Sequence, residues 1–139
     1  MINVSLIFSP YLRPIILCFL FPVWLGKKIK DGDEIVVLSI GHPGNFVIEA
    51  EELLQKKGIN IGHYNMIFLK PIDERLREEI ISNKYEELIF VESNYSGQVE
   101  KHLSNELGLK FIPNLKISNL RKYDLFPFYI EDFNELLNK

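Results

Sequence analysis

Residues 34–58 decide the fold, and they read EIVVLSIGHPGNFVIEAEELLQKKG. The first seven residues form a nearly uninterrupted β-branched and aliphatic run, which is typical of a strand buried on both faces. After the turn at 41–45, apolar residues recur at helical spacing, and the helix is expected to end in two lysines followed by a glycine C-cap. The predicted buried stripe of this helix comprises Phe46, Val47, Ala50, Leu53 and Leu54. A strand, a tight turn and a helix form the repeating unit of a parallel sheet covered by helices.

The same unit recurs along the rest of the chain. Further strands are predicted within 61–69, at 87–91 and within 110–118, the last weakened by Pro113. Three further helices are predicted. The first spans 73–84, the second begins after Ser96 as its N-cap and ends at Gly108, and the third spans about 130–137. Their predicted buried rows are Leu76 and Ile80, then Val99, Leu103 and Leu107, and finally Ile130, Phe133, Leu136 and Leu137. This alternation predicts an α/β fold with helices on both faces of a mostly parallel sheet.

Polar residues follow each predicted strand, at the edge where open parallel sheets receive ligands and partners. His42 and Asn45 lie in the turn GHPGN, Lys70 and Asp73 lie in KPID, and further residues near 119–122 follow the fourth strand. The third loop, VESNYSGQ at 91–98, carries the largest polar set: Glu92, Asn94, Tyr95, Ser96 and Gln98. We expect these loops to lie side by side and to face a partner or ligand, since exposed polar groups clustered on one edge usually carry function.

A structural explanation of the VESNYSGQ residues stands beside the functional one. Ser96 would cap the following helix, Asn94 would shape the turn, and Glu92 would accept hydrogen bonds from helix amides.

The turn GHPGN has the glycines and the helix N-terminus that can hold an anion. It lacks the Gly-Lys-Ser/Thr ending of a P-loop and the G-x-G-x-x-G spacing of a dinucleotide site. The alternative is a tight strand-to-helix turn with Pro43 near the first helical position.

The sequence predicts neither a metal site nor a nucleophilic site. Ser39 and Ser96 lack the G-x-S-x-G elbow, and Cys18 lies in an apolar run that does not favour a thiolate. The histidines are also not spaced as zinc ligands; they are His42, His63 and His102.

Composition narrows the class of protein further. The 139 residues fit one domain. The net charge of -3 gives no electrostatic reason to bind nucleic acid or an anionic membrane. A single cysteine excludes an internal disulfide and a cysteine metal cage, so a cytoplasmic protein is expected.

The segment 15–26, IILCFLFPVWLG, is the most apolar part of the chain. A membrane span needs about 20 uninterrupted apolar residues, and Pro22 breaks this shorter run. No small-residue cleavage site follows it. We predict a buried or partner-covered edge strand, or a remnant of a preceding domain, within 1–26; a signal-like or membrane-associated segment and a truncation are the alternatives.

Four stretches in this order resemble the C-terminal domain of transketolase-like, thiamine-diphosphate-dependent enzymes. They are DGDEIVVLSIG at 31–41, IEAEELLQKKGIN at 48–60, FLKPIDE at 68–74 and LIFVESN at 88–94. The group includes transketolase, deoxyxylulose-phosphate synthase and the beta chains of 2-oxoacid dehydrogenases, and the same module occurs in the alpha chains of 2-oxoacid:ferredoxin oxidoreductases. The resemblance covers about residues 23–139.

Different parts of the chain resemble different branches of this group, and the alpha chains of 2-oxoacid:ferredoxin oxidoreductases are the first choice, with deoxyxylulose-phosphate synthase and the dehydrogenase beta chains second. VESNYSGQVEKHL at 91–103 and LRKYDLFPFYIEDFNELL at 120–137 are most similar to the ferredoxin oxidoreductase alpha chains, although that branch has glycine where this chain has Leu125 or Phe126. LSIGHPGNFVIEA at 38–50 and HYNMIFLKPIDE at 63–74 are more similar to deoxyxylulose-phosphate synthase and the dehydrogenase beta chains.

The resemblance implies a three-layer α/β/α sandwich of about five strands within 27–139, with one antiparallel edge strand that the apolar N-terminal segment could supply. It also implies a non-catalytic domain that completes domain and subunit interfaces in a homo- or hetero-oligomer. Thiamine diphosphate and magnesium would be held by other domains of the parent enzyme, because neither the GDG…N motif nor the activating glutamate is identifiable in this chain.

Three hypotheses follow for function. The first is an assembly module whose VESNYSGQ loop contacts a neighbouring domain or subunit. The second is a free-standing module that binds a small anion at GHPGN and Lys70. The third is an independent small enzyme, which is least favoured because the sequence suggests no nucleophile paired with a base.

Overall fold

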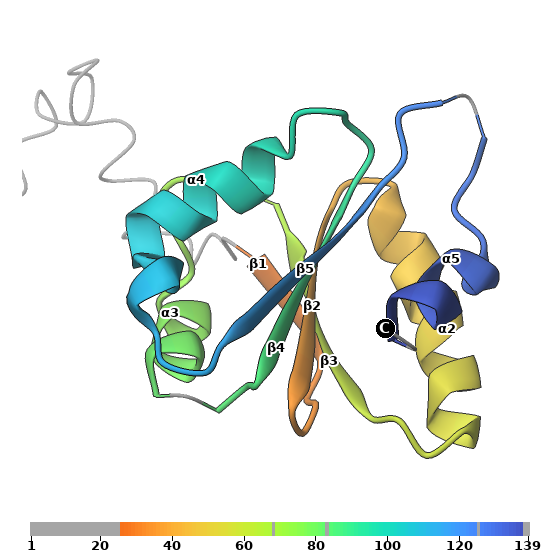
Figure 1. The fold of residues 1–139 in the computed structure, drawn as a ribbon, viewed down its shortest axis with the longest axis horizontal. Coiled ribbons are helices and arrows are strands. Elements are labelled where there is room, and N and C mark those ends of the chain that lie inside the picture. The colour runs from red at the N-terminus through yellow and green to blue at the C-terminus, as the bar shows by residue number, and fades with distance from the viewer. Residues whose placement is uncertain (1–25, 68, 83, 125, 138–139) are drawn as a thin grey trace, which may run out of the picture.

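The computed structural model describes residues 26–137 apart from 68, 83 and 125 (Figure 1). Five strands form one sheet in the order β1-β3-β2-β4-β5. Four of them run parallel: β3 (Ile61–Met66), β2 (Ile35–Ile40), β4 (Glu87–Glu92) and β5 (Lys116–Arg121). The edge strand β1 (Gly26–Lys30) pairs antiparallel with β3.

Helices cover both faces of the sheet, so the fold is the expected three-layer α/β/α sandwich. In Figure 1, α3 (Glu74–Ile81) and α4 (Gln98–Leu107) lie on one face, and α2 (Pro43–Lys56) and α5 (Ile130–Leu137) lie on the other. A short 3₁₀ helix, η2 (Leu109–Phe111), leads from α4 towards β5.

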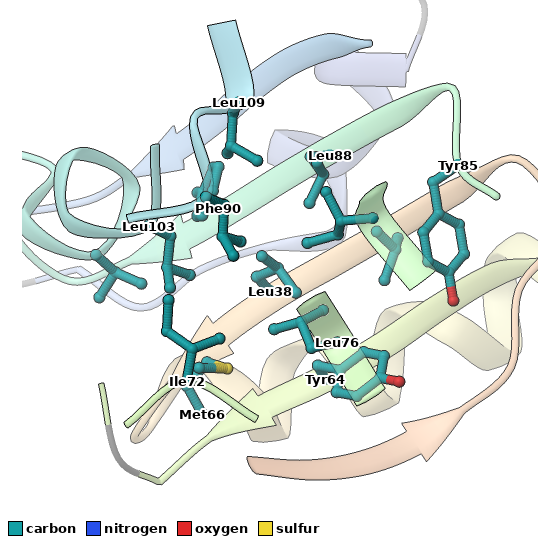
Figure 2. Close-up of a cluster of buried hydrophobic side chains, with 14 residues drawn as sticks. Leu38, Tyr64, Met66, Ile72, Leu76, Tyr85, Leu88, Phe90, Leu103 and Leu109 are labelled. Carbon is teal, nitrogen blue, oxygen red and sulfur yellow. The ribbon is translucent and has the colours of Figure 1, made fainter. Parts of the chain in front are cut away.

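Two apolar cores lie on opposite faces of the central strands. Alternate residues of β4 point to opposite sides: Leu88 and Phe90 pack in the α3/α4 core that Figure 2 shows, and Ile89 and Val91 pack in the α2/α5 core. The continuous apolar runs of β2 and β4 therefore reflect burial on both faces, as predicted.

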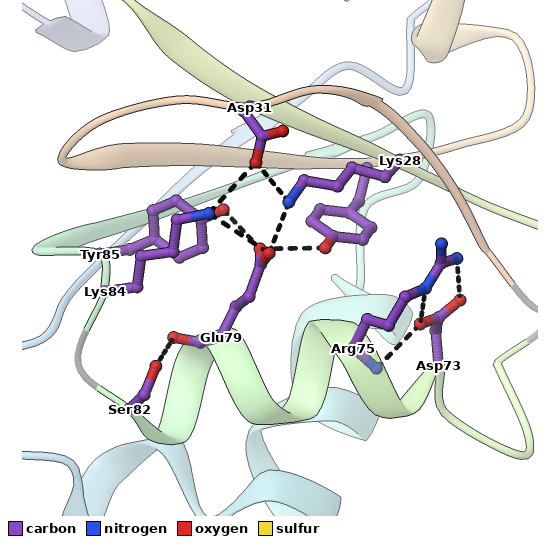
Figure 3. A network of polar contacts seen from close by, with 9 residues as sticks. Lys28, Asp31, Asp73, Arg75, Glu79, Ser82, Lys84 and Tyr85 are labelled. Atoms are coloured by element: carbon purple, nitrogen blue, oxygen red, sulfur yellow. Dashed lines mark hydrogen bonds and ion pairs between the residues drawn. The ribbon is translucent and has the colours of Figure 1, made fainter.

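A polar network fastens the β1 edge to α3 (Figure 3). The carboxylate of Glu79 accepts hydrogen bonds from the hydroxyls of Tyr64 at 3.0 Å and Tyr85 at 2.6 Å, and from the ammonium of Lys28. Partial burial alone would raise the pKa of Glu79, but these hydrogen bonds prevail and lower it to about 2. Glu79 is therefore an ionised anchor for the edge strand.

The strand order shows where along the carboxyl edge of the sheet a binding crevice is expected. The connections after β2 and β4 leave these adjacent strands towards opposite faces, to α2 and to α4. A crevice forms at such a switch point, and ligands and partners meet open α/β sheets there. The turn at 41–45 and the loop at 93–97 border this position.

Two predictions about the elements were wrong in detail, and one lies outside the described residues. The antiparallel edge strand is the lysine-rich segment at 26–30, and lysines are compatible with a sheet edge. The predicted strand or domain remnant within 1–26 falls almost entirely on residues 1–25, which lie outside the described part of the chain. The fourth parallel strand spans 116–121, later than predicted, because a 3₁₀ turn and the left-handed Asn114 occupy the preceding residues. Leu53 is 43% exposed, and Glu51 takes a buried position on α2.

The other buried rows agree with the prediction. Leu76, Ile80, Val99, Leu103, Leu107 and Phe133 are all buried, and Ile130 is half-buried. The predicted burial of Leu136 and Leu137 lies outside the described side chains.

Candidate functional site

Glu92 holds the VESNYSGQ loop together from inside. Its side chain is 0% exposed, and its carboxylate accepts hydrogen bonds from the backbone N–H groups of Val99 at 2.9 Å and Glu100 at 3.0 Å. The side-chain amide of Asn94 donates a third hydrogen bond to it at 2.7 Å. Glu92 therefore caps α4 from the end of β4, and it cannot be one of the exposed contact residues that the sequence suggested.

Asn94 and Gly97 complete the turn. The side-chain oxygen of Asn94 accepts a hydrogen bond from the N–H of Gly97 at 2.7 Å. Gly97 occupies the N-cap position of α4 with a φ of 61°, in the left-handed region that favours glycine. Ser96 was predicted to be this cap and is not, because the carboxylate of Glu92 replaces a capping hydroxyl.

The outward side of the loop has a different character. Tyr95 is 73% exposed, Gln98 is exposed and Ser96 is half-buried. Tyr123 lies in the segment after β5. Its ring and that of Tyr95 pack edge to face, with their centroids 4.9 Å apart. Two loops predicted to be neighbours are thus joined by aromatic contact.

The turn GHPGN lies across the switch point from this loop. His42 and Asn45 are both exposed. Gly44 allows a close approach, because a Cβ there would lie 2.9 Å from the side-chain nitrogen of Asn65 on β3. The N–H groups of Gly44 and Asn45 donate to the backbone oxygens of Gly41 and His42, which leaves these two amides less available to an anion.

Lys70 and Asp73 have partners on their own side of the sheet. Lys70 forms an ion pair with Glu106 of α4 at 2.9 Å, and this contact lowers the pKa of Glu106. Asp73 is buried and caps α3 by accepting the N–H of Arg75 at 3.0 Å. Burial opposes ionisation of Asp73, but the hydrogen bonds from Arg75 lower its pKa. Within the described residues, no hydrogen bond or ion pair joins either residue to the turn GHPGN.

A cleft of about 510 Å³ opens at the switch point. His42, Phe46 and Glu49 of the α2 side line one wall, and Ser93 lies at the end of β4. The other wall comes from the segment between β5 and α5: Lys122, Tyr123, Asp124, Phe126, Pro127 and Phe128. The sequence pointed to this edge as far as residue 122, and the aromatic stretch KYDLFPF at 122–128 is the signal for the rest.

Sequence reasoning missed a buried contact between Ser39, His63 and Glu51. The hydroxyl of Ser39 lies 2.8 Å from Nε2 of His63, and Nδ1 of that ring lies 2.7 Å from a carboxylate oxygen of Glu51. The second contact is close but lacks the alignment of a hydrogen bond. A serine, a histidine and a carboxylate are thus brought together from β2, β3 and α2. Ser39 is only 1% exposed, so the group links the α2 layer to the sheet and does not present a nucleophile.

Neither metal chemistry nor a membrane span is indicated by the described residues. No group of three or more histidine, cysteine or acidic side chains among them is placed to hold a metal ion. None of the helices in the described part of the chain has the length and apolar character needed to cross a bilayer.

The comparisons agree with this architecture. Residues 26–129 match the family described as the C-terminal domain of transketolase, and the chain therefore belongs to that family. The 1-deoxy-D-xylulose-5-phosphate synthase of Parabacteroides distasonis is 51% identical over 72 residues, which cover 52% of this chain and 11% of that protein. The chain thus spans about a tenth of the length of this curated relative.

Solved structures share the fold. A protein described as a split gene transketolase, inactive beta4 tetramer, superposes with a TM-score of 0.65 and 19% identity, covering 81% of this chain and 40% of that one. The 2-oxoglutarate:ferredoxin oxidoreductase of Magnetococcus marinus gives a TM-score of 0.63 and 13% identity, covering 94% and 23%. The resemblance to the C-terminal domain of transketolase-like enzymes is confirmed.

Proposed function

We propose that this chain is the non-catalytic C-terminal assembly module of a thiamine-diphosphate-dependent enzyme, and that it acts by covering a neighbouring domain or subunit with its carboxyl-edge loops. The observation that carries the proposal is the family match over residues 26–129.

The surface that serves this role consists of the outward residues of the switch-point loops. Tyr95, Gln98 and Tyr123 are exposed. Glu92 and Asn94 hold the loop that carries the first two, and Tyr123 contacts the ring of Tyr95. Exposed tyrosines combine apolar area with a hydroxyl and are favoured in protein interfaces.

We favour a transferase of the 1-deoxy-D-xylulose-5-phosphate synthase type as the parent enzyme. The support is 51% identity to the Parabacteroides distasonis synthase over about half of the chain. A 2-oxoacid:ferredoxin oxidoreductase is the alternative, supported by the motifs at 91–103 and 120–137 and by similarity of fold.

The direct test exchanges this domain into the synthase of Parabacteroides distasonis. Residues 26–139 replace the corresponding C-terminal segment, and formation of deoxyxylulose phosphate is measured. The expected result is an active chimera whose activity falls when Tyr95 and Tyr123 are changed to Ala. The matched control changes Ile81, an exposed apolar residue on α3 and outside the switch-point loops, to Ala. A folded chimera without activity would overturn the proposal.

The chain itself is expected not to bind the cofactor, because the diphosphate and magnesium sites would lie on other domains. Isothermal titration of the 139-residue chain with magnesium and thiamine diphosphate tests this expectation. Micromolar affinity would contradict it.

The small-anion module is less well supported by the geometry. Lys70 is engaged by Glu106, and two amides of the GHPGN turn donate within the chain.

A further inference from the structure

A groove runs between α2 and the segment that joins β5 to α5. It consists of the switch-point cleft of about 510 Å³ and an adjoining hollow of about 250 Å³, which share Phe46, Glu49 and Phe128. The rings of Phe46 and Phe128 stack with their centroids 5.4 Å apart. Phe126 and Tyr129, which are 68% and 50% exposed, contribute further aromatic surface. The groove is therefore suited to an apolar side chain.

The charge of the groove is negative. Glu49, Asp124 and Glu131 line it and are exposed, and no cation among the described residues forms an ion pair with any of them. The single lysine of the groove, Lys122, is already paired with Asp132 at 2.8 Å. We refer to the surface formed by these three carboxylates and the aromatic residues named above as the acidic aromatic groove.

The same chain carries a complementary projection. Phe111, at the end of η2, is 78% exposed, the highest value among the large apolar side chains that the structure describes. The ammonium of Lys110 lies 4.9 Å from the centre of its ring. Lys116, at the start of β5, is also exposed, although it contacts Glu87 at 2.9 Å. We refer to Lys110, Phe111 and Lys116 as the basic knob.

We propose that the basic knob of one copy of this chain docks in the acidic aromatic groove of a second copy. Phe111 would bury its ring against Phe126 and Phe128, which removes apolar surface of both partners from water. The two lysines would face the unpaired carboxylates, and a lysine over the exposed rings adds a cation–π attraction. The choice of a second copy rests on the opposite charges of these two apolar surfaces, both carried by one chain.

The positions of the two surfaces determine the form of the assembly. The knob lies before β5 and the groove lies after it, so they stand at opposite ends of that strand (Figure 1). One copy can therefore use its knob and its groove at the same time, with different neighbours. Such a head-to-tail contact extends into chains unless the rotation closes a ring.

Sedimentation velocity over a concentration series tests the proposal on the full chain. The expected result is a sedimentation coefficient that rises beyond that of a dimer and falls when salt is added, since salt screens the facing charges. The knob variant F111A and the groove variant E49K/E131K should each weaken association by about tenfold or more. The changed residues are exposed, so circular dichroism should show an unchanged fold.

The decisive experiment mixes the two variants. F111A keeps an intact groove and E49K/E131K keeps an intact knob, so an equimolar mixture should form a dimer that does not grow further. The matched controls, I81A and E78K, change an exposed apolar residue and an exposed carboxylate on α3 and should associate like the wild type.

Three results would overturn the proposal. They are a wild-type chain that stays monomeric, association that persists unchanged in both variants, and a mixture that forms no dimer. The groove shares Tyr123 with the surface of the proposed function, but the chimera reports enzyme activity and sedimentation reports contacts between copies of this chain, so either experiment can fail without the other.

Discussion

Replacing Glu92 by Ala tests whether a buried carboxylate holds the switch-point loop. The substitution removes the acceptor for two helix N–H groups and for the side-chain amide of Asn94. A hydrogen bond to a charged group contributes about 1.5–3 kcal/mol, and losing a helix cap costs about 0.5–2 kcal/mol. Because these effects overlap at one carboxylate, we expect a loss of about 3–4 kcal/mol in the free energy of unfolding.

The measurement is urea unfolding followed by circular dichroism, with Glu92→Gln and Glu86→Ala as companions. Glutamine keeps the size and one acceptor oxygen, so its loss should be smaller, at about 1–2 kcal/mol. Glu86 is exposed at the other end of β4, and its replacement should change stability by less than about 0.5 kcal/mol. A loss for Glu92→Ala as small as that for Glu86→Ala would refute the capping argument.

Three further outcomes are expected. The pKa of Glu79 is lowered from 4.5 to about 2. At a pH above the unfolded pKa, the ionised carboxylate therefore stabilises the fold by up to about 3 kcal/mol. This contribution is lost as the pH falls through the pKa of the folded state. The difference in unfolding free energy between wild type and Glu79→Gln should therefore shrink between about pH 5 and pH 2; a constant difference would contradict the assignment. Gly97→Ala should cost about 1–2 kcal/mol in urea unfolding, mainly for its positive φ, because the Arg121 guanidinium that a Cβ would meet ends a flexible side chain and can move. Gly41→Ala meets no atom and should cost about 1 kcal/mol for its positive φ alone. A double-mutant cycle of Ser39→Ala and His63→Gln should give a coupling of about 0.5–3 kcal/mol, and additive effects would argue against their contact.

The layers of the fold were predictable because each element carries its own pattern. The apolar runs at 35–40 and 88–91 indicate strands buried on both faces, and the rows of α3 and α4 are buried as their spacing requires. The edge strand was missed because GKKIK has no apolar alternation. Lys28 pairs with Asp31 nearby in the sequence, but its contact with Glu79 of α3 forms only when the chain folds.

The site was predictable in position and less so in the roles of its residues. Loop residues after parallel strands must share one edge, and the structure places the turn GHPGN, the VESNYSGQ loop and residue 122 around one cleft. Sequence spacing does not reveal which polar groups turn inward, and Glu92 and Asp73 became buried caps. The contact of Ser39 with His63 depends on the register of two strands, which no local pattern specifies.

In the VESNYSGQ loop, the residues that fix the backbone are different from the residues that face outward. The groups that fix its shape, Glu92, Asn94 and Gly97, are separate from Tyr95 and Gln98, which point outward. If the proposed function holds, substitutions at the outward positions alter which neighbour is recognised at little cost to folding. A scaffold organised in this way can be reused across unrelated assemblies while its backbone stays the same.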